Sequence, residues 1–215
     1  MKHGLEQILP EQIEKRSFEI IESELPKDRE IPALQKPIVK RVIHTTADFD
    51  YLDNLIFSEG AVERAVAALR RGACIVTDTS MGKAGVNKAS LERLGAQVYC
   101  YMADEDVARE ARERGCTRAT VCMDKAAGLS GPLIFAIGNA PTALVRICEL
   151  INAGRLAPEL VIGVPVGFVN VVQSKELLMQ TDTDYIVAKG RKGGSNVAAA
   201  ICNALIYMAM GETKV

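Results

Sequence analysis

From residue 59 onward, short apolar runs alternate with amphipathic segments, and this alternation leaves the chain few possible folds. The amphipathic segments carry apolar residues at helical spacing, whereas the short runs have the length and composition of buried strands. Strands that alternate with helices predict a mostly parallel sheet covered on both faces, an α/β fold with three layers, α/β/α. The expected strands span residues 73–77, 97–101, 118–122, 133–137, 160–164 and 185–189.

The first sixty residues lack this alternation and are expected to form helices that precede the sheet. Residues 11–24 and 35–45 repeat apolar side chains at helical spacing, and a loop over residues 26–37 separates them. We expect a single domain over residues 1–215, because 215 residues with 48% hydrophobic side chains suffice for one α/β core.

Charge and cysteine content argue against several classes of function. The formal net charge is −1, so the chain lacks the basic excess that binds nucleic acid. The N-terminal segment does not resemble a signal peptide, and no run approaches the roughly eighteen apolar residues of a membrane span. We therefore expect a cytoplasmic protein without membrane contact. The six cysteines form no CxxC pair, which favours reduced thiols over a metal site.

Unusual residues follow four of the expected strands. In a parallel sheet the carboxyl ends of the strands share one edge, and ligands bind in the crevice beside it. The sequence therefore predicts one site built from four loops. The loops are Asp-Thr-Ser-Met-Gly at 78–82, Gly-Asn-Ala-Pro at 138–141, Pro-Val-Gly-Phe at 165–168 and Gly-Arg-Lys-Gly-Gly-Ser-Asn at 190–196.

The glycine-rich loop at 190–196 carries the sharpest signal. Gly193 and Gly194 can expose backbone N–H groups, Ser195 can cap the helix expected over 195–210, and neighbouring basic residues add positive charge. This composition predicts a cradle for carboxylate or phosphate, although an ordinary surface turn is the alternative. The loop matches neither the GxxxxGK[ST] nor the GxGxxG nucleotide motif.

Two other loops allow a purely structural explanation. Residues 138–141 fit a strand-to-helix turn with proline at the first helical position as well as they fit a ligand contact. Residues 165–168 could simply end a strand, but they leave apolar side chains in a loop, which an apolar ligand surface would explain.

His44 is the only histidine beyond the first few residues of the chain. A lone imidazole is a natural proton donor or acceptor near neutral pH, although a histidine at a helix end is often only a capping or surface residue. The residues alone therefore indicate an α/β enzyme that binds an anion, with one candidate acid.

Taken together, several motifs resemble those of the precorrin-8 methylmutases, the precorrin-8X and cobalt-precorrin-8 enzymes of cobalamin biosynthesis. The resemblance covers nearly the whole chain in the same order. The strings are RSFEII at 16–21, VIHTTADFDY at 42–51, GNAPTAL at 138–144, GVPVGFV at 163–169 with SK at 174–175, and GRKGGSN at 190–196.

The resemblance implies an isomerase that moves a methyl group from ring carbon 11 to ring carbon 12 of a tetrapyrrole. The product would be hydrogenobyrinate or its cobalt form, cobyrinate. No organic cofactor and no protein-bound metal are implied, and any cobalt is carried by the substrate. The resemblance also implies a homodimer with the active site near the subunit interface. The VIHTTADFDY string is more similar to the cobalt-first branch of the pathway.

The resemblance also implies roles for single residues. His44 matches the histidine that protonates or hydrogen-bonds the macrocycle, and Arg118 matches an arginine that reaches the substrate from the neighbouring subunit. We expect Arg118 at the start of a strand, at the edge opposite the crevice, with a plain surface arginine as the alternative. The positions expected to line the substrate pocket are Ser17, Ser80, Asn139, Lys192, Gly193, Gly194 and Ser195.

Two other classes of function fit the residues. A non-catalytic corrinoid carrier would use the same pocket without turnover. A phosphate- or nucleotide-using α/β enzyme would need an acidic partner for ribose or magnesium, and Asp78 is the candidate for that role.

Overall fold

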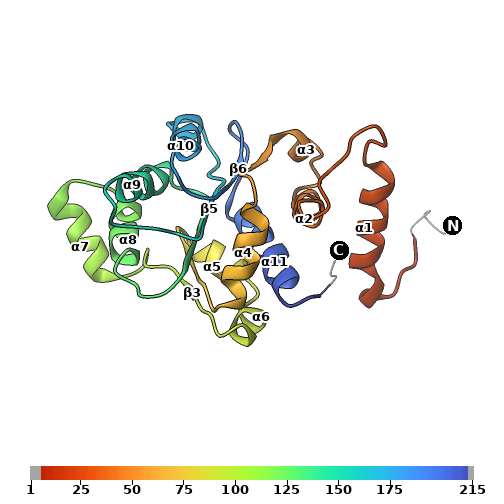
Figure 1. Ribbon diagram of the computed structural model, residues 1–215, viewed down its shortest axis with the longest axis horizontal. Helices are drawn as coiled ribbons and strands as arrows, with labels where there is room; N and C mark the ends of the chain where they lie inside the picture. Colours follow the sequence, from red (N-terminus) through yellow and green to blue (C-terminus); the bar gives the residue numbers. More distant parts are fainter. Residues whose placement is uncertain (1–5, 213–215) are drawn as a thin grey trace.

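The computed structural model describes residues 6–212, and a six-stranded sheet forms its centre (Figure 1). The strand order is β1-β6-β5-β4-β2-β3, and every neighbouring pair is parallel except β1 with β6. The predicted mostly parallel sheet is therefore confirmed. The strands are β1 (Leu55–Phe57), β2 (Cys74–Thr77), β3 (Val98–Tyr99), β4 (Leu133–Ile137), β5 (Leu160–Gly163) and β6 (Tyr185–Ala188).

Helices fill most of the remaining described chain. Four of them precede β1, and α1 and α2 are the two that the apolar spacing of the first residues predicts. The helices are η1 (Pro10–Gln12), α1 (Ile13–Glu24), α2 (Lys36–Thr46), α3 (Tyr51–Asn54), α4 (Ala61–Arg70), α5 (Ser80–Gly85), α6 (Lys88–Arg93), α7 (Glu105–Arg114), α8 (Arg118–Ala126), α9 (Pro141–Asn152), α10 (Val171–Leu178) and α11 (Ser195–Ala209).

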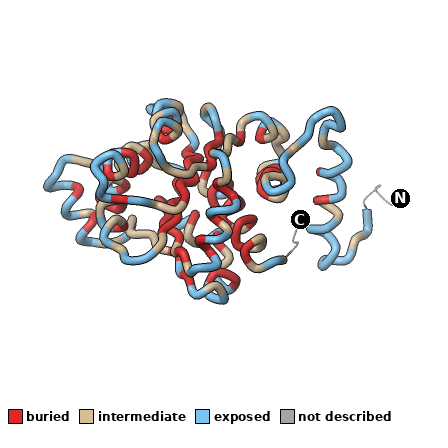
Figure 2. Tube along the Cα trace, in the orientation of Figure 1, coloured by how far each residue is buried: buried red, intermediate tan, exposed pale blue. Residues whose placement is uncertain are grey.

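Helices cover both faces of the sheet, so the three-layer prediction is confirmed. Consecutive strand residues point to opposite faces. Ile134 and Ile162 accordingly enter a core formed with α2, α4 and α11, while Phe135 and Val161 enter a second core formed with α7 to α10. Figure 2 shows the buried residues gathered in the sheet and inner helices, whereas α1 is largely exposed.

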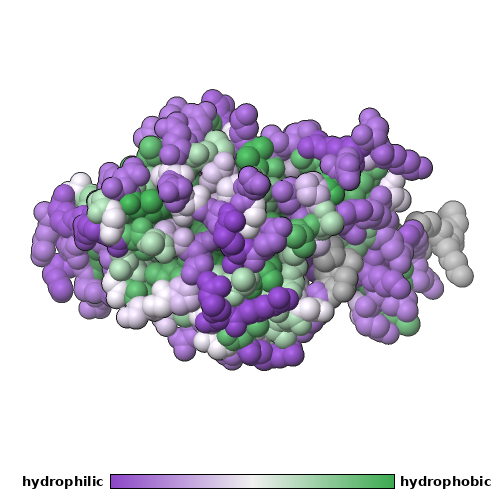
Figure 3. Space-filling view, in the orientation of Figure 1, coloured by the Kyte–Doolittle hydropathy of each residue, from purple (hydrophilic) through white to green (hydrophobic). Residues whose placement is uncertain are grey.

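On the face that Figure 3 shows, the surface is more polar at the ends of the molecule than in its middle. Figure 3 shows hydrophilic residues over the outermost helices and hydrophobic residues grouped near the centre of this face. Among residues 6–212, no helix has the length and apolar content needed to cross a membrane.

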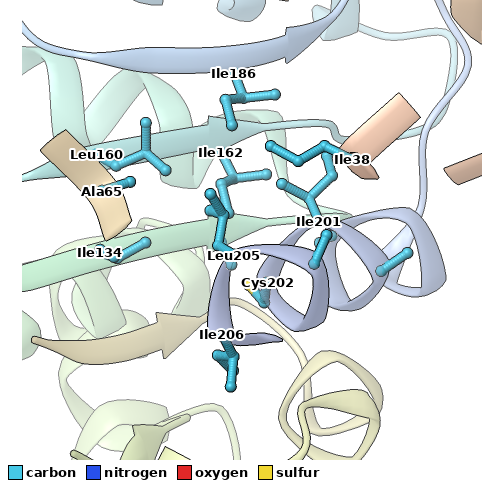
Figure 4. Packing of buried hydrophobic residues seen from close by; sticks show 14 of the residues in the cluster. Ile38, Ala65, Ile134, Leu160, Ile162, Ile186, Ile201, Cys202, Leu205 and Ile206 are labelled. Carbon is cyan, nitrogen blue, oxygen red and sulfur yellow. The ribbon is translucent and has the colours of Figure 1, made fainter. Parts of the chain in front are cut away.

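The helix α11 connects the N-terminal helices to the sheet. Figure 4 shows Ile201 and Leu205 of α11 beside Ile162 of β5, with Ile38 of α2 close to Ile201. All four side chains are at most 1% exposed. Because α2 and the sheet share these contacts with one helix, the position of α2 is set by the core.

Two assignments from the sequence were wrong. Residues 118–122, expected as a strand, begin the helix α8, because Thr117 caps it by accepting a hydrogen bond from the N–H of Thr120. The strand β1 lies in the region expected to be helical. It is only three residues long, which is too short to show a period of its own.

Candidate active site

The four loops predicted to form the crevice meet at the carboxyl edge of the sheet. The hydroxyl oxygens of Thr79 and Ser195 lie 2.7 Å apart, and the N–H of Gly194 donates to Val164 O at 2.9 Å. The loop after β5 joins the same group, since the N–H of Gly167 donates to the carbonyl oxygen of the glycine-rich loop's arginine at 3.2 Å. The prediction that these loops come together at one edge of the sheet is confirmed.

Two glycines allow these loops to pack together. A Cβ atom on Gly138 would lie 2.6 Å from the Cα of Ser195, and one on Gly193 would lie 2.1 Å from Val164 O. Both distances are shorter than atoms can approach, so the loops need glycine at these positions for steric reasons. These contacts establish a structural role for the two glycines, and the anion cradle stays a prediction.

Asp78 fixes the loop after β4 through hydrogen bonds to its backbone. It is 1% exposed, and its carboxylate accepts hydrogen bonds from the N–H groups of Gly138 at 2.9 Å, Asn139 at 2.8 Å and Ala140 at 2.6 Å. Burial raises the pKa of Asp78, and the three N–H donors oppose that shift. Because both carboxylate oxygens serve the backbone, Asp78 does not fit the ribose or magnesium partner of a nucleotide-using enzyme.

Lys175 holds the glycine-rich loop in a comparable way. Its side chain on α10 is 1% exposed, and its amine donates to Gly190 O and Lys192 O, each at 2.8 Å. Burial lowers the pKa of Lys175 to about 8. The sequence contained this lysine within a family string but offered no signal for its role, since burial of a charged side chain depends on tertiary structure.

The antiparallel strand β1 brings His44 to this edge. Leu55 of β1 pairs with Ala188 at the carboxyl end of β6, and Lys189 N–H donates to Asn54 O at 2.7 Å. The short segment between α2 and β1 therefore ends at this edge, and the preceding helix α2 carries His44 in its last turn.

Lys192 links the glycine-rich loop to the end of α2. Its amine lies 2.6 Å from a carboxylate oxygen of Asp48 and 2.6 Å from one of Asp50. The hydrogen bond from Lys192 lowers the pKa of Asp48. The ammonium of Lys192 is thus paired within the protein and links the glycine-rich loop to the end of α2.

His44 and Ser17 lie in one hollow between α1 and α2. The hollow has a volume of about 370 Å³ and is lined by Ser17, Ile20, Ile21, Glu24, Ile43, His44, Ala47 and Phe49. Beside it, the exposed His44 ring packs against Phe18, with ring centroids 4.9 Å apart and planes tilted by 30°. Phe18 is 4% exposed and was missed as a site residue, although it stands next to Ser17 in the RSFEII string.

Arg118 lies at a different place from the one predicted. It is the first residue of α8, and the adjacent Thr117 hydroxyl lies 2.9 Å from that of Thr142 in the first turn of α9. Arg118 therefore sits at the carboxyl edge and not at the opposite one. Figure 1 nevertheless shows α8 and α2 on opposite sides of the sheet, so one chain does not bring Arg118 to His44.

The remaining predicted positions and an apolar patch line the same edge. Ser80 is the exposed first residue of α5, and the Asn139 side chain is exposed in the loop after β4. Phe168 is 81% exposed and Val169 78% exposed, and the guanidinium carbon of Arg191 lies 5.4 Å from the Phe168 ring centre. Neighbouring large apolar side chains that are exposed in this way are typical of a surface that contacts a ligand or a partner.

The described residues contain no group of three or more His, Cys, Asp or Glu side chains arranged to hold a metal ion. All six cysteines are free thiols, as expected. Burial raises the pKa of Cys202 and of Cys122 to about 12 and that of Cys148 to about 11, so these three stay protonated and unreactive.

The fold is a three-layer α/β sheet protein, and the loops at the carboxyl edge carry glycine-rich turns and exposed apolar side chains, with His44 in a hollow at the neighbouring helix α2. The family model described as precorrin-8X methylmutase matches residues 12–208. The chain belongs to the precorrin-8X methylmutase family. It is an isomerase of cobalamin synthesis that transfers a methyl group within a tetrapyrrole.

Individual relatives agree with this assignment. The cobalt-precorrin-8 methylmutase of Salmonella typhimurium is 46% identical over 92% of this chain and 95% of the relative. That of Priestia megaterium is 43% identical over 94% of this chain and 89% of the relative. A crystal structure of the precorrin-8X methylmutase from Thermus thermophilus superposes with a TM-score of 0.84 and 39% identity, covering 93% of this chain and 98% of that one.

Replacing Asp78 tests how much its three backbone hydrogen bonds contribute to the stability of the fold. We expect Asp78→Asn to lower the free energy of unfolding by about 2–3 kcal/mol, because the amide has one acceptor oxygen and presents N–H donors to N–H donors. Urea unfolding of both proteins measures the difference. A change below about 0.5 kcal/mol would show that the three hydrogen bonds contribute little.

Proposed function

We propose that the protein converts cobalt-precorrin-8 to cobyrinate by moving the methyl group from ring carbon 11 to ring carbon 12. One observation carries the proposal. His44 and Ser17 share a hollow between α1 and α2, and Lys192 of the glycine-rich loop is paired with Asp48, just after the end of α2. A single ligand at this edge would contact the acid and the loop together.

The chemistry of the edge suits such a substrate. A tetrapyrrole of this class has an apolar macrocycle with carboxylates around its rim. Phe168 and Val169 offer apolar surface to the macrocycle, whereas N–H groups of the glycine-rich loop are suited to carboxylates. Ser80, Asn139 and the loop residues 192–195 are the proposed substrate contacts.

His44 is the proposed catalytic residue. Its imidazole donates a proton or a strong hydrogen bond to the conjugated ring system while the methyl group migrates, and Phe18 limits the orientation of the imidazole. Substrate and product are isomers, so a donated proton must return to the enzyme by the end of the cycle. The reaction needs no organic cofactor, and cobalt enters and leaves as part of the substrate.

The active protein is proposed to be a homodimer in which Arg118 reaches the partner's substrate. Within one chain, Arg118 and His44 lie on opposite sides of the sheet (Figure 1). A symmetric dimer that placed α8 of one copy beside α2 of the other would supply the missing cation to each site.

Visible absorption spectra recorded over time show whether the protein serves the cobalt-containing or the metal-free branch of the pathway. We expect catalytic amounts of the protein to convert cobalt-precorrin-8 faster than metal-free precorrin-8, because the Salmonella and Priestia relatives both carry the cobalt name. Faster conversion of the metal-free substrate would assign the protein to the other branch. A spectral shift that is stoichiometric with protein and then stops would instead indicate a corrinoid carrier.

Replacing His44 separates catalysis from binding. We expect His44→Ala to lower kcat about tenfold or more, since proton donation of this kind contributes about 10²–10⁴-fold. The Kd for the product should stay within about twofold of the wild-type value, because the macrocycle is held mainly by the loops. Equal kcat values would remove His44 from the mechanism.

Complementation tests the shared site. His44→Ala and Arg118→Ala chains carrying different tags are co-expressed and purified through both tags. Each mixed dimer then has one site with both residues intact, so we expect about half the wild-type activity from two nearly inactive parents. Activity no higher than that of the parents would place Arg118 outside the partner's site.

A further inference from the structure

The buried amine of Lys175 fixes the direction of two peptide groups in the glycine-rich loop. It donates to Gly190 O and Lys192 O, both at 2.8 Å. The described chain contains no cis peptide bond, and in a trans peptide the C=O and N–H groups point in opposite directions. The N–H groups of Arg191 and Gly193 therefore point away from the amine.

These two N–H groups are available to a ligand. Within residues 6–212, neither has a hydrogen-bond acceptor, whereas the neighbouring Gly194 N–H is bonded to Val164 O. Lys175 is buried beneath the loop, while Arg191 and Lys192 are exposed above it. The N–H groups of Arg191 and Gly193 therefore point toward the solvent-exposed side of the loop. Two such N–H groups form a concavity suited to an anion.

We propose that Lys175 is a positioning residue that turns the Arg191 and Gly193 N–H groups outward, so that they bind one carboxylate of the substrate. The inference rests on the proposed function, since it names the group that this loop recognises. The adjacent guanidinium of Arg191 lies over the Phe168 ring and adds positive charge beside the carboxylate site. Lys175 itself does not contact the substrate.

The burial of Lys175 supports a functional role. Among the described residues, its amine is bonded to two carbonyl oxygens and to no carboxylate, and burying a charge without a counter-ion destabilises the fold. An apolar side chain of similar length would avoid that cost but would leave the two carbonyl groups free to rotate. A positive charge beneath the loop also attracts an anion above it.

Steady-state kinetics with Lys175→Met test the proposal. Methionine has a similar length and no donor, so we expect the KM for cobalt-precorrin-8 and the Kd for cobyrinate to rise about tenfold, with kcat nearly unchanged. Lys88→Met, the same change at an exposed lysine on α6, serves as the matched control and should leave both constants unchanged. Unchanged KM and Kd in a folded Lys175→Met protein would overturn the proposal.

A measurement on the wild-type protein covers the case in which Lys175→Met does not fold. Metal-free hydrogenobyrinate is titrated into ¹⁵N-labelled protein, and the amide signals of Arg191 and Gly193 should move more than that of the bonded Gly194. Movement elsewhere in the crevice without these two amides would refute the carboxylate site. Failure of the wild-type protein to convert either substrate would instead refute the proposed function, so the two failures remain distinct.

Discussion

Loops at the edge of a parallel sheet lose the ladder hydrogen bonds that the strands provide, and their buried backbone groups need other partners. This protein satisfies them with two buried charges of opposite sign. The carboxylate of Asp78 accepts three N–H groups after β4, and the amine of Lys175 donates to two carbonyl groups after β6. The two loops then meet at Gly138 and Ser195, so the floor of the crevice depends on both charges.

The position of His44 depends on the smallest strand of the sheet. β1 is antiparallel to β6, so the chain enters it at the same edge where the parallel strands end. This reversal adds a third link between the end of α2 and the sheet edge, beside the packing of α2 on α11 and the ion pair of Lys192 with Asp48.

The sequence allowed the core strands and the crevice loops to be predicted, because residues 133–137 and 160–164 are continuous apolar runs followed by glycine or proline. It misplaced Arg118, because five residues such as RATVC fit a strand as well as a helix, and the Thr117 cap decides between them. The roles of Asp78 and Lys175 could not be predicted, since only the folded chain shows that they are buried. The contact between Phe18 and His44 likewise joins two helices.

The two sides of the histidine hollow differ in how firmly they are held. The α2 side is packed on α11 and the sheet, whereas α1 buries only Phe18 and Ile21 and is otherwise attached to α2 by ion pairs of its half-exposed Glu14 and Glu22. Ion pairs with an exposed partner are weakened by solvent and salt. Local opening at α1 therefore disturbs less of the core than opening at α2, and it would widen the hollow beside the imidazole while the loops that follow the strands keep their geometry.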